Sequence, residues 1–400
     1  MSKAPLMAVE AAIEELLRLA EQAPFDAIET LPLAQGLGRV LARSLSAQID
    51  SPPWDNSAMD GYALRLADWS GGALPVSRRV LAGQAPGVLE AGTCIRIFTG
   101  APIPQGADCV VLQEDCEVAA DGRVLPRSPL RAGMNIRLRG EEIRQGAPLF
   151  AAGKRLGPAE LGVLAAQGYA SVPLVHRPRV ALFTSGDELV EAGAPLAPGQ
   201  IYNANRTLLA AALQRLGCEV LDLGNVADDP EQLRALLDAL PPVELILSSG
   251  GVSVGDADFI SALLKAEGQV RLWKLAIKPG KPFTFAHFKG TPFIGLPGNP
   301  GSALVTFALL ARPYLLRRMG VPHTAPLHLP VRAGFDWPRA GNRQEYLRVS
   351  LVEGEARLYA NQSSGVLLSA ACTDGLLEVL PGLAFQRGTL LNFIPLTALF

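Results

Sequence analysis

The fold is decided by a stretch that opens with RVALFTSG (179–186) and continues with NANRTLLAAALQRLG (203–217). The first segment is an apolar run that ends in a glycine turn, and the second carries apolar residues at helical spacing. This alternation of strand-like and helix-like segments continues to residue 320. Because strands that alternate with amphipathic helices form βαβ units, residues 178–326 are expected to form a three-layer α/β domain with a mostly parallel sheet.

The sequence on either side of this stretch predicts three further units. Residues 51–140 contain short β-branched runs separated by Gly, Pro and Asp, which is typical of a small β-rich domain. We expect this domain to be inserted into an elongated arm made of residues 1–50 and 141–177. Strand-like runs with glycine turns return after residue 326, so residues 327–400 predict a small C-terminal β sandwich or barrel. The expected fold is a multidomain combination of α/β and β units.

Composition excludes several classes of protein. The chain has 400 residues and a net charge of −2, which argues against a general nucleic-acid binder. Its five cysteines are scattered and its four histidines lack metal-ligand spacing, so neither a disulfide framework nor a histidine-built metal site is expected. No apolar run approaches the roughly 18 residues of a membrane span, and the N-terminus lacks a signal-peptide pattern. These features favour a soluble, cytoplasmic protein that does not bind membranes.

The polar and glycine-rich segments of the α/β stretch follow its predicted strands. Ligands of open α/β sheets bind outside the carboxyl ends of the strands, so we expect these segments to converge on one edge of the sheet. The segments are TSGDE (184–188), DD (228–229), SGGVSVGD (249–256) and LPGNPGS (296–302).

Two of these segments have the composition of anion-binding loops. Glycines let backbone N–H groups approach a phosphate closely, and a following helix N-terminus adds positive potential. A plain strand-to-helix turn is the alternative for the first loop, and helix capping by Asn299 with Pro300 at the first helical position is the alternative for the second. The candidate substrate-binding residues are Ser249, Gly250, Gly251, Ser253 and Gly255 in the first loop, and Pro297, Gly298, Asn299 and Pro300 in the second.

Carboxylates on the same edge of the sheet suit a divalent cation. Mg²⁺ prefers oxygen ligands and shares them with substrate phosphates, so Asp187, Glu188, Asp228 and Asp256 are the candidate metal ligands. The alternative for Asp228 and Asp256 is that each one opens a helix, where an acidic residue is favoured anyway.

Lysines cluster at the end of one predicted strand. In WKLAIKPGKP (273–282), Lys274 and Lys278 fall on one strand face while Leu275 and Ile277 face the core, and Lys281 follows in a turn. Three ammonium groups at this position could hold an oxyanion. The alternative is an ordinary solvated strand face.

Eight long motifs occur in a fixed order along the chain. They are DNSAMDGYA (55–63), IRIFTGAPIP (95–104), NIRLRGEE (135–142), LFTSGDELV (182–190), GQIYNAN (199–205), SSGGVSVGDAD (248–258), WKLAIKPGKP (273–282) and LPGNPGSA (296–303). Taken together in this order, they resemble the molybdopterin molybdenumtransferase family, to which the catalytic domain of gephyrin belongs. The match runs from residue 7 to about 320, and the remaining residues agree only in their β texture.

This resemblance implies an activity and an assembly. The implied substrates are adenylylated molybdopterin and molybdate, with cleavage of the phosphoanhydride in the presence of Mg²⁺ or another divalent cation, release of AMP and insertion of molybdenum. The implied assembly is an elongated homodimer whose active site lies between the α/β domain of one subunit and the β-rich domain of the other. A molybdopterin adenylyltransferase is the implied partner that supplies the substrate.

The resemblance also assigns roles residue by residue. Where relatives can have Gly-Glu-Asp, this chain has Gly140-Glu141-Glu142, so no metal contact is assigned to Glu142. Arg348, Ser363 and Ser364 are weaker candidates for molybdate binding. The implied catalytic residues are Asp60, Glu188, Asp228, Lys274 and Lys278, and the implied substrate contacts are Thr99, Asp258, Pro297 and Pro300. Lys281 is a candidate substrate contact through its place in the lysine cluster, not through the resemblance.

Two alternatives remain beside this interpretation. A molybdopterin adenylyltransferase would share the α/β domain but typically lacks the DNSAMDGYA region and the flanking β domains. A scaffold protein, as gephyrin also is, would be expected to carry an additional domain or a long disordered linker.

Overall fold

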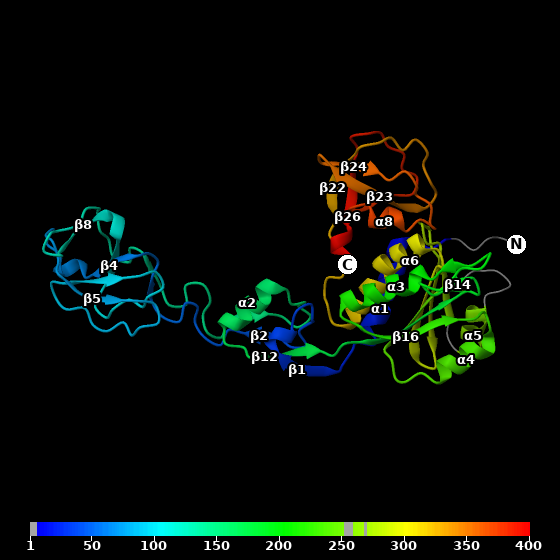
Figure 1. Cartoon of the computed structure of the whole chain (residues 1–400), viewed down its shortest axis with the longest axis horizontal. Helices are drawn as coiled ribbons and strands as arrows, with labels where there is room; N and C mark the ends of the chain where they lie inside the picture. The colour runs from blue at the N-terminus through cyan, green and yellow to red at the C-terminus, as the bar shows by residue number, and fades with distance from the viewer. Residues whose placement is uncertain (1–5, 252–258, 268–269) are drawn as a thin grey trace.

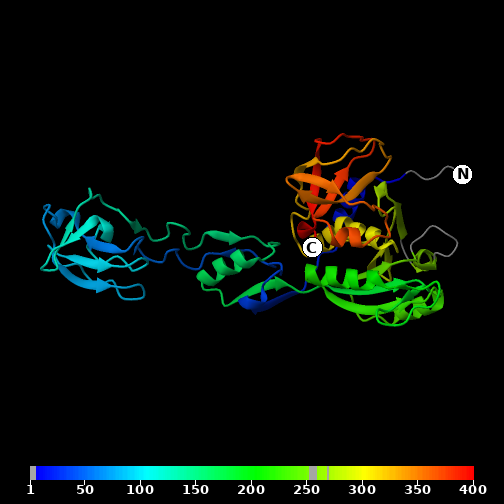
Figure 2. The same cartoon turned by 45° about the horizontal axis from the view of Figure 1, so that its top comes forward.

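The computed structural model describes residues 6–251, 259–267 and 270–400. The molecule is elongated, with a small β-rich domain at one end, a narrow arm in the middle, and the α/β and C-terminal domains together at the other end (Figures 1 and 2). This confirms the expected multidomain α/β and β fold. Ser253, Gly255, Asp256 and Asp258, which the sequence marks as site residues, lie outside the described residues.

The α/β domain is built on one six-stranded sheet, in which only β20 runs against the others. The parallel core is in register, with Val180 of β13 opposite Leu245 of β17 and Ile246 of β17 opposite Phe293 of β21. The strands, in their order across the sheet, are β16 (Glu219–Val226), β13 (Arg179–Ser185), β17 (Leu245–Ser249), β21 (Thr291–Leu296), β20 (Pro282–Phe288) and β18 (Val270–Lys274).

Helices cover both faces of this sheet. Side chains alternate along β13, so Val180 and Leu182 enter one core while Ala181 and Phe183 enter the other. The first core is covered by α1 (Val9–Glu21), α3 (Ala204–Leu216), α6 (Pro300–Thr306) and α7 (Arg312–Arg318). The second core is covered by α4 (Pro230–Asp238) and α5 (Phe259–Glu267).

A π-helical turn at Phe307–Ala311 joins α6 to α7. Pro313 explains its position, because proline lacks the N–H that would bond one turn back and its ring crowds the carbonyl four residues earlier. The helix widens for one turn before the proline, and all five residues of this turn are buried.

The first helix differs from the predicted domain boundary. We expected residues 1–50 to belong wholly to the arm, but α1 packs on α7 and the π-helical turn of the α/β domain. Its buried stripe of Ala12, Leu16 and Ala20 is apolar at helical spacing and belongs to the core of the α/β domain. The chain therefore enters the arm only after this helix.

The arm consists of two antiparallel pairs and one helix. Strand β1 (Ile28–Pro32) pairs with β12 (Ser171–Val175), and β2 (Leu45–Ser46) pairs with β11 (Pro148–Phe150). Helix α2 (Pro158–Ala166) covers them, and Leu41, Leu164 and Leu174 form the small core. The two segments of the arm thus lie on either side of an inserted domain.

The inserted domain, which we call the distal domain, is a four-stranded sheet with a core on each face. Two short pairs extend it: β8 (Cys116–Val118) with β9 (Val124–Pro126), and β3 (Asn56–Ser57) with β10 (Ile136–Arg137). The strands of the sheet, in order, are β5 (Val76–Val80), β6 (Cys94–Ile97), β4 (Gly61–Leu64) and β7 (Cys109–Leu112).

The C-terminal domain is a closed barrel of five strands, because β23 pairs with both β24 and β25. A short sixth strand, β19 (Ile277–Lys278), comes from the α/β region and pairs with the start of β23. The short helix α8 (Leu368–Ala371) precedes β25. The barrel strands are β23 (Gln344–Val352), β24 (Glu355–Leu358), β22 (Leu329–Ala333), β26 (Leu390–Pro395) and β25 (Gly375–Val379).

Among the helices of the described residues, none has the length and apolar character needed to cross a membrane.

Candidate functional site

A pocket of about 500 Å³ opens at the carboxyl ends of β13, β17 and β21. The described parts of the segments that the sequence predicted to converge meet here, since each follows one of the strands of the sheet. The lining residues include Ser185, Gly186, Glu188, Asp228, Ser249, Gly250, Gly251, Pro297, Gly298, Asn299 and Pro300.

Asp228 is held at the pocket by residues that follow β13. The Ser185 hydroxyl donates to Asp228 Oδ1 at 2.6 Å, and the Asp228 backbone N–H donates to Asp187 Oδ1 at 3.2 Å. Helix capping, the alternative for Asp228, falls instead to Asp229, which accepts from the N–H groups of Glu231 and Gln232. Asp228 is thus exposed at the pocket, and its Oδ2 accepts no hydrogen bond from the residues that the structure describes.

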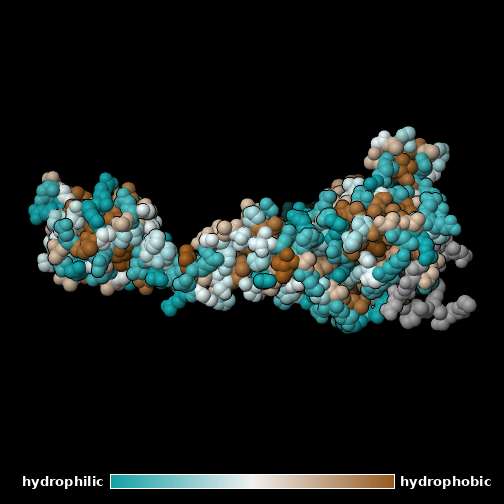
Figure 3. Space-filling view, turned by 90° about the horizontal axis from the view of Figure 1, so that it is seen from below, coloured by the Kyte–Doolittle hydropathy of each residue, from teal (hydrophilic) through white to brown (hydrophobic). Residues whose placement is uncertain are grey.

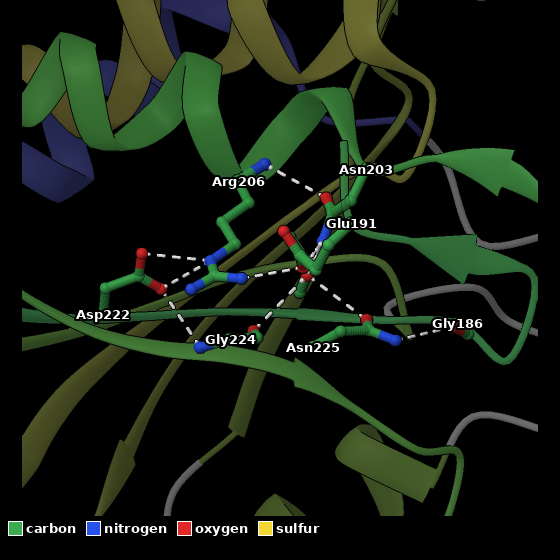
Figure 4. Close-up of polar contacts among 8 residues, drawn as sticks. Gly186, Glu191, Asn203, Arg206, Asp222, Gly224 and Asn225 are labelled. Atoms are coloured by element: carbon green, nitrogen blue, oxygen red, sulfur yellow. Dashed lines mark hydrogen bonds and ion pairs between the residues drawn. The ribbon is translucent and has the colours of Figure 1, made fainter. Parts of the chain in front are cut away.

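A hydrogen-bond network behind the pocket fixes the loop that carries Glu188 (Figure 4). The Asn203 amide donates to Thr184 Oγ1 at 2.7 Å, and the Asn225 amide donates to the Gly186 carbonyl at 3.0 Å. Arg206, one turn into α3, forms ion pairs with Glu191 and Asp222. These contacts therefore fix the loop that follows β13 against β16 and the start of α3.

A short pair of parallel strands contributes residues to the pocket lining. Strand β14 (Leu189–Val190) pairs with β15 (Ile201–Tyr202), and the Ile201 N–H donates to the Glu188 carbonyl at 2.9 Å. Ile201 and Tyr202 line the pocket although both side chains are about half exposed. This pair directs residues 187–191 back toward the pocket.

The glycine loop after β17 is set by close backbone approach. Gly250 has φ +94°, and a Cβ at this position would lie 2.2 Å from the Ser185 carbonyl oxygen. Any other residue would push apart the ends of β13 and β17, so glycine is required here. Of the residues predicted for this loop, Ser249, Gly250 and Gly251 line the pocket.

Asn205 joins the two loops that the sequence marks as anion-binding. Its amide nitrogen donates to Ser249 Oγ at 2.8 Å and to the Gly298 carbonyl at 2.6 Å. Its Oδ1 is buried and has no partner among the described residues, which leaves one acceptor in the pocket wall for a ligand N–H or a cation. The sequence analysis did not predict Asn205 as a site residue. It is the last residue of the GQIYNAN motif (199–205), which supported the resemblance and could have indicated it.

The Pro-Gly-Asn-Pro loop opens α6 at the pocket and touches the barrel. Asn299 is the N-cap residue and Pro300 the first helical residue, as predicted, but the Asn299 side chain makes no capping bond. The Gly301 N–H donates to the Ser364 carbonyl of the C-terminal domain at 2.8 Å. Ser302, the last residue of the predicted LPGNPGS segment, lines the pocket and is buried.

The predicted lysine strand is split in the structure. Strand β18 ends at Lys274, and the chain then crosses to the barrel, where β19 pairs with Gln344 and Glu345. Lys278 Nζ lies 2.9 Å from Glu345 Oε2, so Lys278 is ion-paired to the barrel instead of sharing one strand face with Lys274. Leu275 and Ile277 are buried as expected. Lys281 is exposed, immediately before Pro282 of the pocket lining.

Another basic residue lies deep in the barrel wall next to this region. Arg348 is 2% exposed, and its guanidinium donates to Ser369 Oγ and to the carbonyls of Tyr346 and Ser363. All three acceptors are neutral. Burial lowers the pKa of Arg348, as expected for a cation taken out of water.

Asp60 and Thr99 are at the opposite end of the molecule, in the distal domain (Figure 1). The Thr99 backbone N–H and hydroxyl both donate to Asp60 Oδ1 at 2.8 Å. These hydrogen bonds, followed by the charge of Arg96, lower the pKa of Asp60. Within one chain the two residues do not reach the α/β pocket.

The described carboxylates at the α/β pocket do not form a closed metal cage. Within the described ranges no three His, Cys, Asp or Glu residues are grouped closely enough to hold a metal ion. Glu188 and the free oxygen of Asp228 are oxygen donors on one side of the pocket. This sparse set fits Mg²⁺, which is commonly bound by one or two carboxylates together with substrate phosphates.

Comparisons with known proteins cover the whole length of this architecture. Family models match residues 7–168 (MoeA N-terminal region, domains I and II), 181–317 (probable molybdopterin binding domain) and 330–396 (MoeA C-terminal region, domain IV). The molybdopterin molybdenumtransferase of Synechococcus elongatus is 40% identical over 380 residues, covering 91% of this chain and 93% of the relative. The chain belongs to the molybdopterin molybdenumtransferase family.

Other relatives agree with this assignment. The molybdopterin molybdenumtransferase of Haemophilus influenzae is 40% identical and covers 83% of each chain. A crystal structure described as a molybdopterin biosynthesis moeA protein from Pyrococcus horikosii is 32% identical, covers 98% of this chain and 99% of its own, and superposes with a TM-score of 0.77. The match to molybdopterin molybdenumtransferases includes the distal domain and the arm, which the adenylyltransferase alternative does not explain. The chain is therefore an enzyme of this transferase family.

Proposed function

We propose that this protein transfers molybdenum from molybdate to adenylylated molybdopterin, cleaves the phosphoanhydride and releases AMP. The observation that carries the proposal is the convergence of Glu188, Asp228, the glycine loop and the Pro-Gly-Asn-Pro loop on one pocket of about 500 Å³. A pocket of this size accommodates a pterin with its phosphates. Backbone N–H groups of the glycine loop suit phosphate, and the Asn205 acceptor suits a donor on the ligand.

In this proposal Glu188 and Asp228 would hold Mg²⁺, with Asp187 fixing the backbone of Asp228. A bound Mg²⁺ supplies charge stabilisation on the phosphate oxygens during cleavage. Ser185 keeps the Asp228 carboxylate in place through its hydroxyl. Asp256 and Asp258 stay candidates in the same loop region, as a metal ligand and a substrate contact respectively.

The basic residues around the pocket are the proposed molybdate site. Lys274, Lys278 and Lys281 lie on the segment that leads into Pro282 of the pocket lining. Arg348 supplies a further buried cation with only neutral partners, and its Ser363 acceptor lies next to Ser364, which contacts the start of α6. A dianion is the ligand that such cations favour.

We further propose that the active site is shared between two subunits of a homodimer, since Asp60 and Thr99 are distant from the pocket of their own chain. Exposed apolar side chains flank both halves: Ile201 and Tyr202 beside the pocket, and Met59 beside Asp60. Figure 3 shows apolar residues exposed along the arm and the α/β domain as well. Burial of such surface is the usual driving force for a symmetric dimer.

The chemistry of the substrate implies its source. Adenylylated molybdopterin must come from an adenylyltransferase, and direct transfer from that enzyme protects a labile anhydride from water. We place the reaction in the cytoplasm, consistent with five cysteines that are all unpaired.

The experiment is AMP release from adenylylated molybdopterin, measured with and without molybdate and with Mg²⁺ added or chelated. The proposal predicts release that requires molybdate and falls when Mg²⁺ is removed. AMP release that does not depend on molybdate, or net adenylylation of molybdopterin from ATP, would contradict it.

Arg348→Gln removes the buried guanidinium and should raise the KM for molybdate more than it changes kcat.

A further inference from the structure

A row of side chains crosses one face of the distal sheet. Register places Arg79 of β5 opposite Arg96 of β6, and Arg96 opposite Tyr62 of β4. Phe98 follows two positions after Arg96 and therefore faces the same side. Asp60 and Thr99 border this row, so we name Asp60, Tyr62, Arg96, Phe98 and Thr99 the distal cluster.

Arg96 is held by the two rings of the distal cluster. Its guanidinium carbon lies 4.9 Å from the Tyr62 ring centroid and 4.8 Å from the Phe98 ring centroid. Cation–π contacts at this separation stabilise a guanidinium and restrict its rotation. The partly buried position adds to the restriction, since Arg96 is less exposed than Arg79 on the neighbouring strand.

The hydrogen bonds of Arg96 go only to neutral acceptors. Nη1 donates to the Gly61 carbonyl at 3.2 Å, and Nη2 donates to Gln113 Oε1. No carboxylate forms an ion pair with Arg96 among the residues that the structure describes, although its charge helps to lower the pKa of both Asp60 and Glu114. The remaining N–H groups of the guanidinium match the oxygens of a phosphate.

The distal cluster also has a free acceptor beside this cation. Asp60 Oδ1 accepts from the backbone N–H and the hydroxyl of Thr99, and Oδ2 has no hydrogen-bond partner in the described part of the chain. Gly61 brings the two groups together, because its carbonyl accepts from Arg96 and it directly follows Asp60. A Cβ on Gly61 would lie 1.9 Å from the Val111 carbonyl oxygen, so this approach of β4 to β7 requires glycine.

We propose that Arg96 binds a phosphate group of the nucleotide in the shared site, held for that purpose between Tyr62 and Phe98. The ligand class is a nucleoside 5′-phosphate, which is both part of the substrate and the released product. This inference rests on the proposed function for the identity of the nucleotide. Arg96 forms no covalent bond; it orients the phosphate and offsets its charge while Asp60 stays ionised alongside.

The first test measures binding of AMP and of inorganic phosphate to the full-length protein by calorimetry, without any turnover. Loss of charge-assisted hydrogen bonds is worth about 1.5–3 kcal/mol, so Arg96→Gln should weaken AMP binding roughly 10- to 100-fold. Arg96→Lys keeps the charge but loses the planar fork, and an intermediate loss is expected. Phe98→Leu leaves the cation and loosens its position, and a loss of a few-fold is expected.

The matched control is Arg123→Gln, which removes a cation from an exposed ion pair with Asp121 in the same domain. AMP binding to this variant should equal that of the wild type. Thermal unfolding of Arg96→Lys and Arg96→Gln checks that the distal sheet is intact. Equal AMP affinity of wild type, Arg96→Lys and Arg96→Gln would overturn the inference, as would failure of AMP to bind the wild type at all.

A turnover measurement separates this inference from the proposed function. Suppose that the wild type releases AMP in a molybdate-dependent reaction and that Arg96→Lys has an unchanged KM for adenylylated molybdopterin. The inference about Arg96 then fails while the proposed function stands. If release ignores molybdate but AMP binding still depends on Arg96, the proposed function fails while the nucleotide site stands.

Discussion

The α/β pocket and the distal cluster are two halves of a proposed site that are built by different means. The pocket is shaped by close backbone packing and one buried side chain: Gly250 permits contact between strand ends, and the Asn205 amide joins two loops. The distal cluster consists of side chains on the face of a sheet that has its own two cores. Changes in the pocket should therefore disturb structure and activity together, whereas changes at Asp60 and Thr99, which lie outside both cores of the distal domain, should disturb activity alone.

The largest expected effect is the loss of both carboxylates from the pocket. Glu188→Gln combined with Asp228→Asn removes the proposed metal ligands and should lower molybdate-dependent AMP release by a factor of at least about 10³, as for removal of essential charge stabilisation. Initial rates at saturating Mg²⁺ measure this effect.

The control for this variant is Asp229→Asn. Asp229 caps α4, and asparagine caps a helix about as well as aspartate, so activity should persist. Near-normal activity of the double variant would remove Glu188 and Asp228 from the mechanism.

The next effect isolates the distal half. Asp60→Asn should lower the rate of AMP release roughly 100-fold or more while the unfolding temperature stays at the wild-type value, because the carboxylate is partly exposed and outside both cores. An Asp60→Asn protein with a lowered unfolding temperature would contradict the separation of the two halves.

Thr99→Val removes one hydrogen bond to Asp60 and should raise the pKa of this carboxyl. The acidic limb of the profile of rate against pH should therefore shift to higher pH.

A smaller effect tests the backbone construction of the pocket. Gly250→Ala should lower the unfolding free energy of the α/β domain by about 1–3 kcal/mol, because φ is positive and the new Cβ meets the Ser185 carbonyl. Gly298→Ala is the matched control, since its Cβ would lie 3.7 Å from the nearest atom. Differential scanning calorimetry of the two variants gives the comparison. Equal stability would show that the loop tolerates a side chain.

The smallest effect concerns pH. Burial, with added repulsion from Arg271 and Arg318, lowers the pKa of His287. Below the ordinary pKa of about 6.5 the unfolded chain protonates this histidine more readily than the folded protein does. The folded state therefore keeps its full stability above about pH 6.5 and loses some of it as the pH falls below that value. His287→Phe keeps a ring against Phe285 but cannot take up a proton. The unfolding temperature of this variant should therefore fall less between pH 7.5 and 5.5 than that of the wild type. An identical loss in both proteins would exclude His287 as a contributor.

The periodicity of strands and helices predicted the three-layer domain and the meeting of its loops, because carboxyl ends of parallel strands share one edge. It could not decide between neighbours such as Asp228 and Asp229, since only the position of α4 shows which one caps the helix. It placed Lys274 and Lys278 on one strand, whereas long-range pairing with Glu345 takes Lys278 to the barrel.

The distal half was harder to predict. Nothing in its spacing indicated a ligand, and only the resemblance pointed to Asp60 and Thr99. Arg96 becomes a candidate only when the register of β4, β5 and β6 shows the two rings that enclose it. Similarly, α1 was assigned to the arm because its amphipathic stripe does not say which domain covers it.

The central claim is that one active site needs the pocket of one subunit and the distal cluster of another. Complementation tests it directly: Asp60→Asn protein is mixed with Glu188→Gln/Asp228→Asn protein under conditions that allow subunits to exchange, and molybdate-dependent AMP release is measured. In a symmetric dimer half of the mixed population is heterodimeric with one intact site of two, so the account predicts recovery to about a quarter of wild-type activity. A mixture no more active than its separate components would contradict the account.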